Sequence, residues 1–324
     1  MKQISIPSSV ISIGEATFFE CGLLKQISIS PAIESICNNT FNMCTSLISI
    51  NIPSSAISIG NFSFNSCSSL KEIIIPSSVI SIGTHSFCEC SSLTKVLFED
   101  SSSVSSIGAL AFFGCTALEH INIPNGKNSI EIGLFNKCES LACVIIPHSV
   151  TIIEKEAFIK CYSLTQIFIL DSVTSIGDDA FNECLSLTEI IIPSSVTSMG
   201  KSAFKGCSLL TQVSFEIPSS LALIQMNEFE DCYSLMKISI PSSVTSVEAN
   251  AFKGCSSLNQ ILFENPSSLT KIEKLAFYGC SLLTEIIIPS SVIAIGENAF
   301  KNCNINQSKS NFPSIINLKS IGVY

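Results

Sequence analysis

Tryptophan is absent from this 324-residue sequence, histidine occurs three times, and charged residues make up only 13% of the chain. The 17 Lys and Arg are spread thinly against 26 Asp and Glu, and the formal charge is −9. This balance argues against a nucleic-acid surface, where clustered basic residues are expected. No apolar run reaches the roughly 18 residues of a membrane span. The first ten residues lack the continuous apolar segment of a signal peptide, so we predict neither feature.

Motifs of common catalytic sites are also missing. The sequence has no Gly-rich phosphate loop, no Gly-x-Ser-x-Gly and no His-Glu-x-x-His. His85, His120 and His148 fall at different phases of the repeat that fills the chain, so stacking would not bring them together. Cys88 and Cys90 form a Cys-x-Cys pair without the second pair or nearby His of a zinc site. We therefore predict a non-enzymatic protein with no catalytic residue, no cofactor and no metal.

The sequence does contain one short unit, repeated along its whole length. Phe stands three residues before Cys in thirteen copies, from Phe18 and Cys21 to Phe300 and Cys303, and the cysteines are 23 or 25 residues apart. A fixed period in this range predicts a solenoid, in which each unit is covered only by its neighbours. Such a chain grows in one dimension, so its length does not imply two globular domains.

Three pieces can be distinguished within one unit. Leu187 to Ile192, Leu-x-x-Ile-x-Ile, alternates like a strand with one buried face. Pro-Ser-Ser ends that strand, because Pro lacks the amide proton that a sheet needs, and a shorter extended piece follows. The segment before the Cys, such as Asp178 to Cys184, is predicted to form a short helical or 3-10 turn. The predicted fold is therefore an α/β repeat of about 13 units of 23–25 residues. It would have one long parallel sheet, with the helical or 3-10 turns on the opposite side. We predict a solenoid over residues 1–303 and a degenerate C-terminal half-repeat over residues 304–324.

The consensus Leu-x-x-Ile-x-Ile, Pro-x-Ser-Val-x-x-Ile-Gly-x-x-Ala-Phe-x-x-Cys resembles the leucine-rich repeats of the BspA-like surface antigens, the treponemal type. The resemblance covers residues 3–303. It implies a leucine-rich-repeat solenoid, display on the cell surface or secretion, and adhesion to a host matrix or surface protein. The missing signal peptide and anchor, together with many cysteines, favour the alternative of an intracellular scaffold for protein–protein interaction, since free thiols persist in a reducing compartment.

The thirteen cysteines of the repeat are expected to be buried free thiols, because each lies three residues from a core Phe and behaves as a small hydrophobe. Three units are longer by two residues and carry Phe-Glu after the strand, at 98–99, 215–216 and 263–264. We interpret these insertions as wider loops whose gap the Phe fills. A functional acidic rim is the alternative.

One position of each strand lies between two inward residues and must point outward, since side chains alternate. In the middle of the chain this column is apolar, which predicts an exposed ridge that binds a protein ligand or a second copy of the chain, with Phe168 as an anchor. Self-association through uncapped solenoid ends is a further prediction. The alternative is that β-branched residues at these positions merely favour strands. The predicted binding residues are Ile74, Leu97, Ile145, Phe168 and Ile191.

Overall fold

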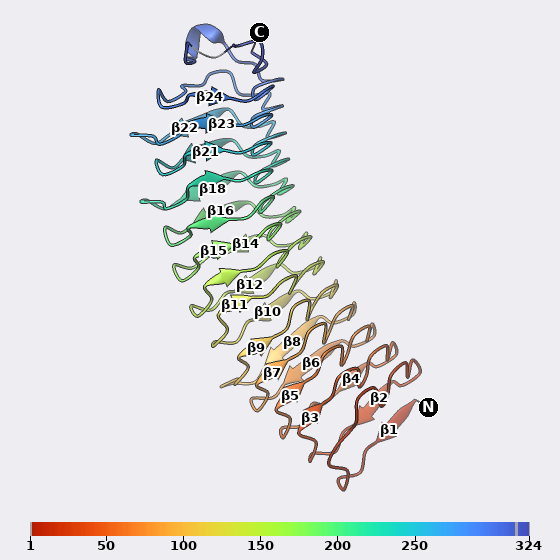
Figure 1. Cartoon of the computed structure of the whole chain (residues 1–324). Helices are drawn as coiled ribbons and strands as arrows, with labels where there is room; N and C mark the ends of the chain where they lie inside the picture. Colours follow the sequence, from red (N-terminus) through yellow and green to blue (C-terminus); the bar gives the residue numbers. More distant parts are fainter. Residues whose placement is uncertain (1, 315–316, 324) are drawn as a thin grey trace. The chain divides into compact units, whose positions relative to one another are not determined.

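The computed structural model describes residues 2–314 and 317–323. The chain divides into two compact units: unit 1 comprises Met1–Val150 with Glu156–Leu164, and unit 2 comprises Thr151–Lys155 with Thr165–Tyr324. Within each unit, successive turns of the chain stack on one another, and most turns contribute a strand to each of two faces (Figure 1). The predicted parallel-sheet solenoid is confirmed.

The longer strands form one face of each unit, called here the long-strand face. Neighbouring strands are parallel, and each residue pairs with the residue at the same position of the next repeat. Ile74 thus pairs with Leu97, and Ile191 with Ser214. The thirteenth predicted strand, after Leu283, is reduced to an isolated bridge between Ile287 and Asn311. In unit 1 the strands are β1 (Gln3–Ser5), β2 (Gln26–Ser28), β4 (Ser49–Ile50), β6 (Glu72–Ile75), β8 (Lys95–Phe98), β10 (His120–Asn122) and β12 (Cys143–Ile145). In unit 2 they are β14 (Gln166–Ile167), β16 (Glu189–Ile192), β18 (Gln212–Phe215), β20 (Lys237–Ile240) and β22 (Gln260–Phe263).

A second face is built from two-residue strands that follow the turn after the long-strand face, a turn that is Pro-Ser-Ser in many repeats. They too pair in parallel, for example Ser198 with Ser175. In unit 1 they are β3 (Ser35–Ile36), β5 (Ser58–Ile59), β7 (Ser81–Ile82), β9 (Ser106–Ile107) and β11 (Ser129–Ile130). In unit 2 they are β13 (Ile152–Ile153), β15 (Ser175–Ile176), β17 (Ser198–Met199), β19 (Leu223–Ile224), β21 (Ser246–Val247), β23 (Lys271–Ile272) and β24 (Ala294–Ile295).

The core between the faces contains the inward residues of both strands and a column of stacked Phe rings. In unit 2, the ring of Phe204 lies 5.2 Å from that of Phe181 and 5.6 Å from that of Phe229, nearly parallel to both. The same stacking runs from Phe18 to Phe158 in unit 1. Each ring is therefore covered by its neighbours, as the repeat predicts.

The segment before each Cys differs from the prediction, because it forms hydrogen-bonded turns instead of short helical or 3-10 turns. Asp179 and Glu183, two residues before and after Phe181, have φ of +54° and +58°. All thirteen units have positive φ at these two positions, which a right-handed helix cannot include. The gain is a contact between turns: Asp179, Phe181 and Glu183 donate their backbone N–H to carbonyls of the next turn. We call this arrangement the turn ladder. The helix that the described residues do contain is the 3-10 helix η1 (Gln307–Lys309).

The predicted half-repeat at 304–324 lies partly outside the described residues, at 315–316 and 324. In the described part, Ser320 and Ile321 provide carbonyls to Asn298 and Phe300, and the Ile321 side chain is buried. These contacts continue the turn ladder by one step. The boundary at residue 303 stays a prediction.

Gly200 lies where the backbones of two turns approach closely. A Cβ at this position would overlap the backbone nitrogen of Asp178 and the carbonyl carbon of Gly177. Both atoms are backbone atoms, which cannot yield as the end of a flexible side chain does, so Gly200→Ala is expected to reduce the free energy of unfolding by about 1–3 kcal/mol. Chemical denaturation of the whole chain measures this loss.

Gly14 supplies the matched control, because it occupies the equivalent position of the first repeat. A Cβ there would meet only Thr17 Oγ1, at an ordinary 3.6 Å. Gly14→Ala is therefore expected to leave stability unchanged or raise it slightly. Equal losses from both substitutions would contradict the steric explanation.

Candidate functional site

Structure places all five predicted binding residues on the long-strand face with exposed side chains. In unit 1, Ile74 and Leu97 are register partners on β6 and β8, with 47% and 38% of their surface exposed. Ile145 on β12, 63% exposed, is separated from them by Asn122 of β10. In unit 2, Phe168 and Ile191 are 71% and 55% exposed. The structure therefore supports their outward orientation, and their role in binding stays a prediction.

The strand neighbours of these residues point the other way. Ile73, Ile75, Ile190 and Ile192 are each at most 1% exposed. The alternation that buries them is what forces the ridge residues outward. Because the core is already filled by the inward residues, the exposed side chains add nothing to it.

Unit 2 also contains a cleft that sequence reasoning did not find. It has a volume of about 900 Å³, and its lining includes Leu262, Pro266, Ile287, Pro289 and Lys309. Leu262 and Ile287 are 50% and 70% exposed and lie in the same outward column as Phe168 and Ile191. One wall comes from β22 and the inserted loop after it, the other from residues 285–291 of the next repeat, and Lys309 of the C-terminal segment adds to the lining. The insertion after Phe263 is the sequence signal that could have indicated the cleft, because the residues of its other wall follow the ordinary repeat.

A column of polar side chains lies beside the apolar one, two residues earlier in each strand. In unit 1, Glu72 and Lys95 are register partners. In unit 2, Glu189 pairs with Gln212, and Gln212 in turn with Lys237. All five are exposed. The long-strand face thus combines apolar side chains with charges of both signs.

The repeat cysteines face the core and form a second regular array, the thiol ladder. Cys207 Sγ donates to the carbonyl oxygen of Phe181 in the preceding turn, at 3.2 Å. Burial raises the pKa of the Cys207 thiol from 9.0 to about 12. A thiol held protonated is a poor nucleophile and a poor metal ligand. Cysteines that donate in this way are Cys44, Cys67, Cys90, Cys115, Cys138, Cys161, Cys207, Cys232, Cys255, Cys280 and Cys303.

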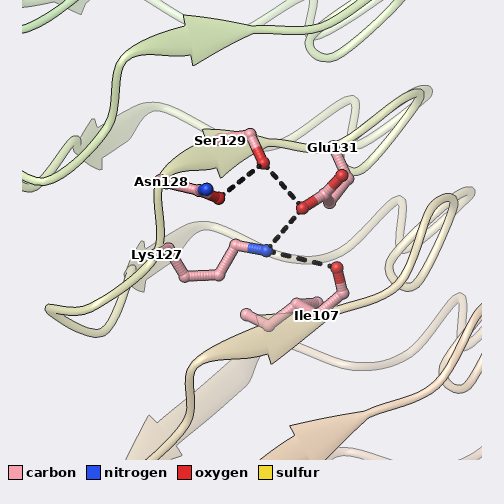
Figure 2. Close-up of polar contacts among 5 residues, drawn as sticks. All are labelled: Ile107, Lys127, Asn128, Ser129 and Glu131. Atoms are coloured by element: carbon pink, nitrogen blue, oxygen red, sulfur yellow. Dashed lines mark hydrogen bonds and ion pairs between the residues drawn. The ribbon is translucent and has the colours of Figure 1, made fainter.

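Lys127 is a buried charge in unit 1, and Figure 2 shows its surroundings. It takes the place that Val104 and Val150 take in neighbouring repeats, and its side chain is 1% exposed. Its Nζ lies 2.8 Å from Glu131 Oε1 and donates to the Ile107 carbonyl at 3.3 Å. Ser129 Oγ donates to the same carboxylate oxygen at 2.8 Å. The lysine is thus paired within the core and is unable to reach a ligand.

The three Phe-Glu insertions have a structural role in the loops. Glu99 accepts a hydrogen bond from the backbone N–H of Ser77 in the preceding turn, at 3.0 Å, and Glu216 and Glu264 do the same for Ser194 and Ser242. The Phe rings before them are half-buried, and the interpretation that they fill the gap of the wider loops stays a prediction. The carboxylates hold the wider loops to the neighbouring turn, which disfavours a free acidic rim.

The structure does not join the histidines into a site. His85 stacks on Phe62 with ring centroids 4.7 Å apart, and burial lowers the pKa of its imidazole. Within residues 2–314 and 317–323, no group of three His, Cys, Asp or Glu residues could hold a metal ion. No helix in the same residues has the length and apolarity to cross a membrane.

Comparison with known proteins identifies the family. The model of the BspA type leucine rich repeat region (6 copies) matches residues 1–103, 98–211 and 209–324. This chain therefore belongs to the BspA-type leucine-rich-repeat family, as the repeat consensus indicated. The comparison with curated protein sequences gave no match.

Among solved structures, a leucine-rich repeat protein from Bacteroides ovatus is 29% identical, with a TM-score of 0.86 over 98% of this chain and 82% of that one. A leucine-rich repeat protein from Eubacterium ventriosum is 20% identical, with a TM-score of 0.59 over 99% of this chain and 93% of that one. Both are similar to this chain in fold.

Proposed function

We propose that this protein is a non-enzymatic binding module that takes a protein ligand on its long-strand face, in the manner of an adhesin. The observation that supports the proposal most is the exposure of Ile74, Leu97, Ile145, Phe168 and Ile191 on strands whose preceding residues are buried. Burying such side chains against a partner contributes roughly 1.5–3 kcal/mol each. The ligand class is a protein, such as a host matrix or surface protein, and not a nucleic acid.

The intracellular scaffold is the second candidate, and the thiol ladder favours it. Cys207, Cys232 and Cys255 are free thiols buried in the core. Free thiols in such number persist more readily in a reducing compartment than outside the cell. Labelling of intact cells with a membrane-impermeant biotin reagent separates the candidates: an adhesin is labelled, and an intracellular scaffold is labelled only after lysis.

The binding surface can be tested with the double variant Phe168→Ser, Ile145→Ser, which changes one exposed residue in each unit. Proteins retained by the immobilised chain from matrix and intracellular extracts are purified, and their affinities are then measured by surface plasmon resonance. Loss of a central aromatic anchor costs about 2 kcal/mol or more, so a loss of roughly 30-fold or more in affinity is expected. The thermal midpoint should hardly change, because both side chains are exposed.

The matched control is the double variant Ile57→Ser, Ile293→Ser. It also removes one exposed isoleucine from each unit, 49% and 67% exposed, but away from the long-strand face. The control is expected to bind as the parent does. Unchanged binding by the Phe168 and Ile145 variant would mean that the apolar column serves only strand formation, and the proposed site would be abandoned.

A further inference from the structure

We propose that the long-strand face of unit 2 binds a second copy of this chain, face to face, with a twofold axis along strand β18 (Gln212–Phe215). This inference rests on the proposed function, because it names the protein that the exposed apolar residues bind. Rotation about an axis parallel to the strands reverses the order of the strands in the second copy. Each column of side chains then faces the same column of the other copy. Strands one step before β18 then face strands one step after it.

The charges on the face complement themselves under this operation. Glu189 on β16 and Lys237 on β20 lie one strand to either side of Gln212, in the same column. Reversal about β18 places Glu189 of one copy opposite Lys237 of the other, and the symmetry makes this contact twice. Gln212 meets its own counterpart on the axis, where its amide can both donate and accept.

The apolar column is complementary in the same register. Ser214, on the axis, and Ser239 follow Ile191 along the array, so small side chains lie next to projecting ones. Reversal brings Ile191, which is 55% exposed, over Ser239 of the second copy. The projecting side chain of Ile191 therefore faces the small side chain of Ser239, and the small Ser214 side chains on the axis allow the two sheets to approach each other.

Phe168 fits the cleft in the same arrangement. It lies two strands before β18, and Leu262 lies two strands after it, so the axis carries Phe168 to Leu262 of the second copy. Leu262 lines the cleft of about 900 Å³, together with Pro266, Ile287 and Pro289. An exposed aromatic ring and a cleft with apolar side chains in its lining thus meet twice in one assembly. Self-complementary patches of this kind are what a twofold interface requires.

If the ligand were an unrelated protein, there would be no reason for the charges and the apolar side chains of this face to complement a reversed copy of the same face. Both columns are self-complementary about the same axis, at Gln212 in one and Ser214 in the other. Agreement between two independent columns favours a second copy as the occupant.

Charge reversal tests the arrangement by sedimentation velocity of the full chain over a range of concentrations. Wild type is expected to dimerise reversibly. Glu189→Lys and Lys237→Glu each create two like-charge contacts, so each variant alone should dimerise at least about tenfold more weakly. An equimolar mixture of the two variants restores both opposite-charge contacts and should regain dimers close to the wild-type level. Lys95→Glu, on the same face in unit 1, is the control and should leave dimerisation unchanged.

Two results would overturn the proposal: a wild-type chain that stays monomeric at its highest soluble concentration, and a mixture no more dimeric than its separate components. The proposed function fails separately. If the wild-type chain is monomeric but binds another protein, and the Phe168→Ser, Ile145→Ser variant loses that binding, only the proposed dimer is refuted. If the double variant keeps its ligand, the binding site itself is refuted.

Discussion

Raising the pH from about 9 toward 12 is expected to unfold this protein, because the thiol ladder must stay protonated in the fold. Burial raises the pKa of Cys44 and of Cys207 from 9.0 to about 12. The unfolded chain releases these protons near pH 9, while the folded chain keeps them. Fewer protons are then bound in the unfolded state, so the stability that is fully present below pH 9 is lost as the pH rises. Burial also raises the thiol pKa of Cys67, Cys90, Cys115, Cys138, Cys232, Cys255 and Cys280.

Each buried thiol contributes a slope of about 1.4 kcal/mol per pH unit within this window. Several such thiols together exceed the roughly 5–15 kcal/mol stability of an ordinary domain, so the midpoint of alkaline unfolding should fall near pH 10 to 11. Circular dichroism along a pH titration measures it. Cys207→Ala should make the transition less steep, whereas Cys143→Ala, whose side chain is exposed, should leave it as it is. A flat stability profile up to pH 11 would contradict the role of the thiols.

Removing the counterion of Lys127 is expected to have the largest effect of any single substitution. Glu131→Gln removes the negative charge beside the buried ammonium and leaves it only neutral acceptors, such as the Ile107 carbonyl. Breaking a buried ion pair by removing one partner costs about 3–5 kcal/mol, because an uncompensated charge stays in the core. Denaturant titration of the variant and the parent measures the difference.

The double variant Lys127→Val, Glu131→Gly serves as the compensated control. It restores the residues that stand at these positions in the preceding repeat, Val104 and Gly108. Replacing a buried ion pair by packed apolar groups is often neutral or stabilising, so this variant should equal or exceed the parent. If Glu131→Gln is no less stable than the double variant, the ion pair does not secure the lysine.

The parts of the fold that the sequence predicted are those in which one residue type repeats at one position. Phe and Cys at a fixed spacing indicated the stacked rings, and alternating Leu and Ile indicated strands with one buried face. The outward column followed from alternation alone, which is why Phe168 and Ile191 are exposed as expected. Whether the column binds anything depends on a partner, and no pattern within one chain specifies that.

The turns and the buried lysine show where sequence reasoning reached its limit. Positive φ falls on residues as different as Asp179, Leu275 and Lys137, so no residue type marks it, and a short segment with helical spacing was the natural interpretation. These conformations are imposed by hydrogen bonds to the next turn. The Lys127–Glu131 pair was detectable in principle, because the lysine replaces Val and the glutamate replaces Gly within one repeat.

The turn ladder itself has an electrical direction along the stack of each unit. Its peptide groups form chains in which a carbonyl accepts from the turn before while the N–H that follows donates to the turn after. One such chain in unit 2 passes from Asp179 through Ser202, Asn227, Asn250, Leu275 and Asn298 to the carbonyl of Ser320. Peptide dipoles aligned head to tail add to a macrodipole, as they do in an α-helix. Here the N–H groups of the ladder point toward higher residue numbers, so the positive pole of the ladder lies at its C-terminal end, the reverse of a helix. Hydrogen bonds in such chains also polarise one another, which makes a turn within the chain more strongly held than a turn paired on one side only.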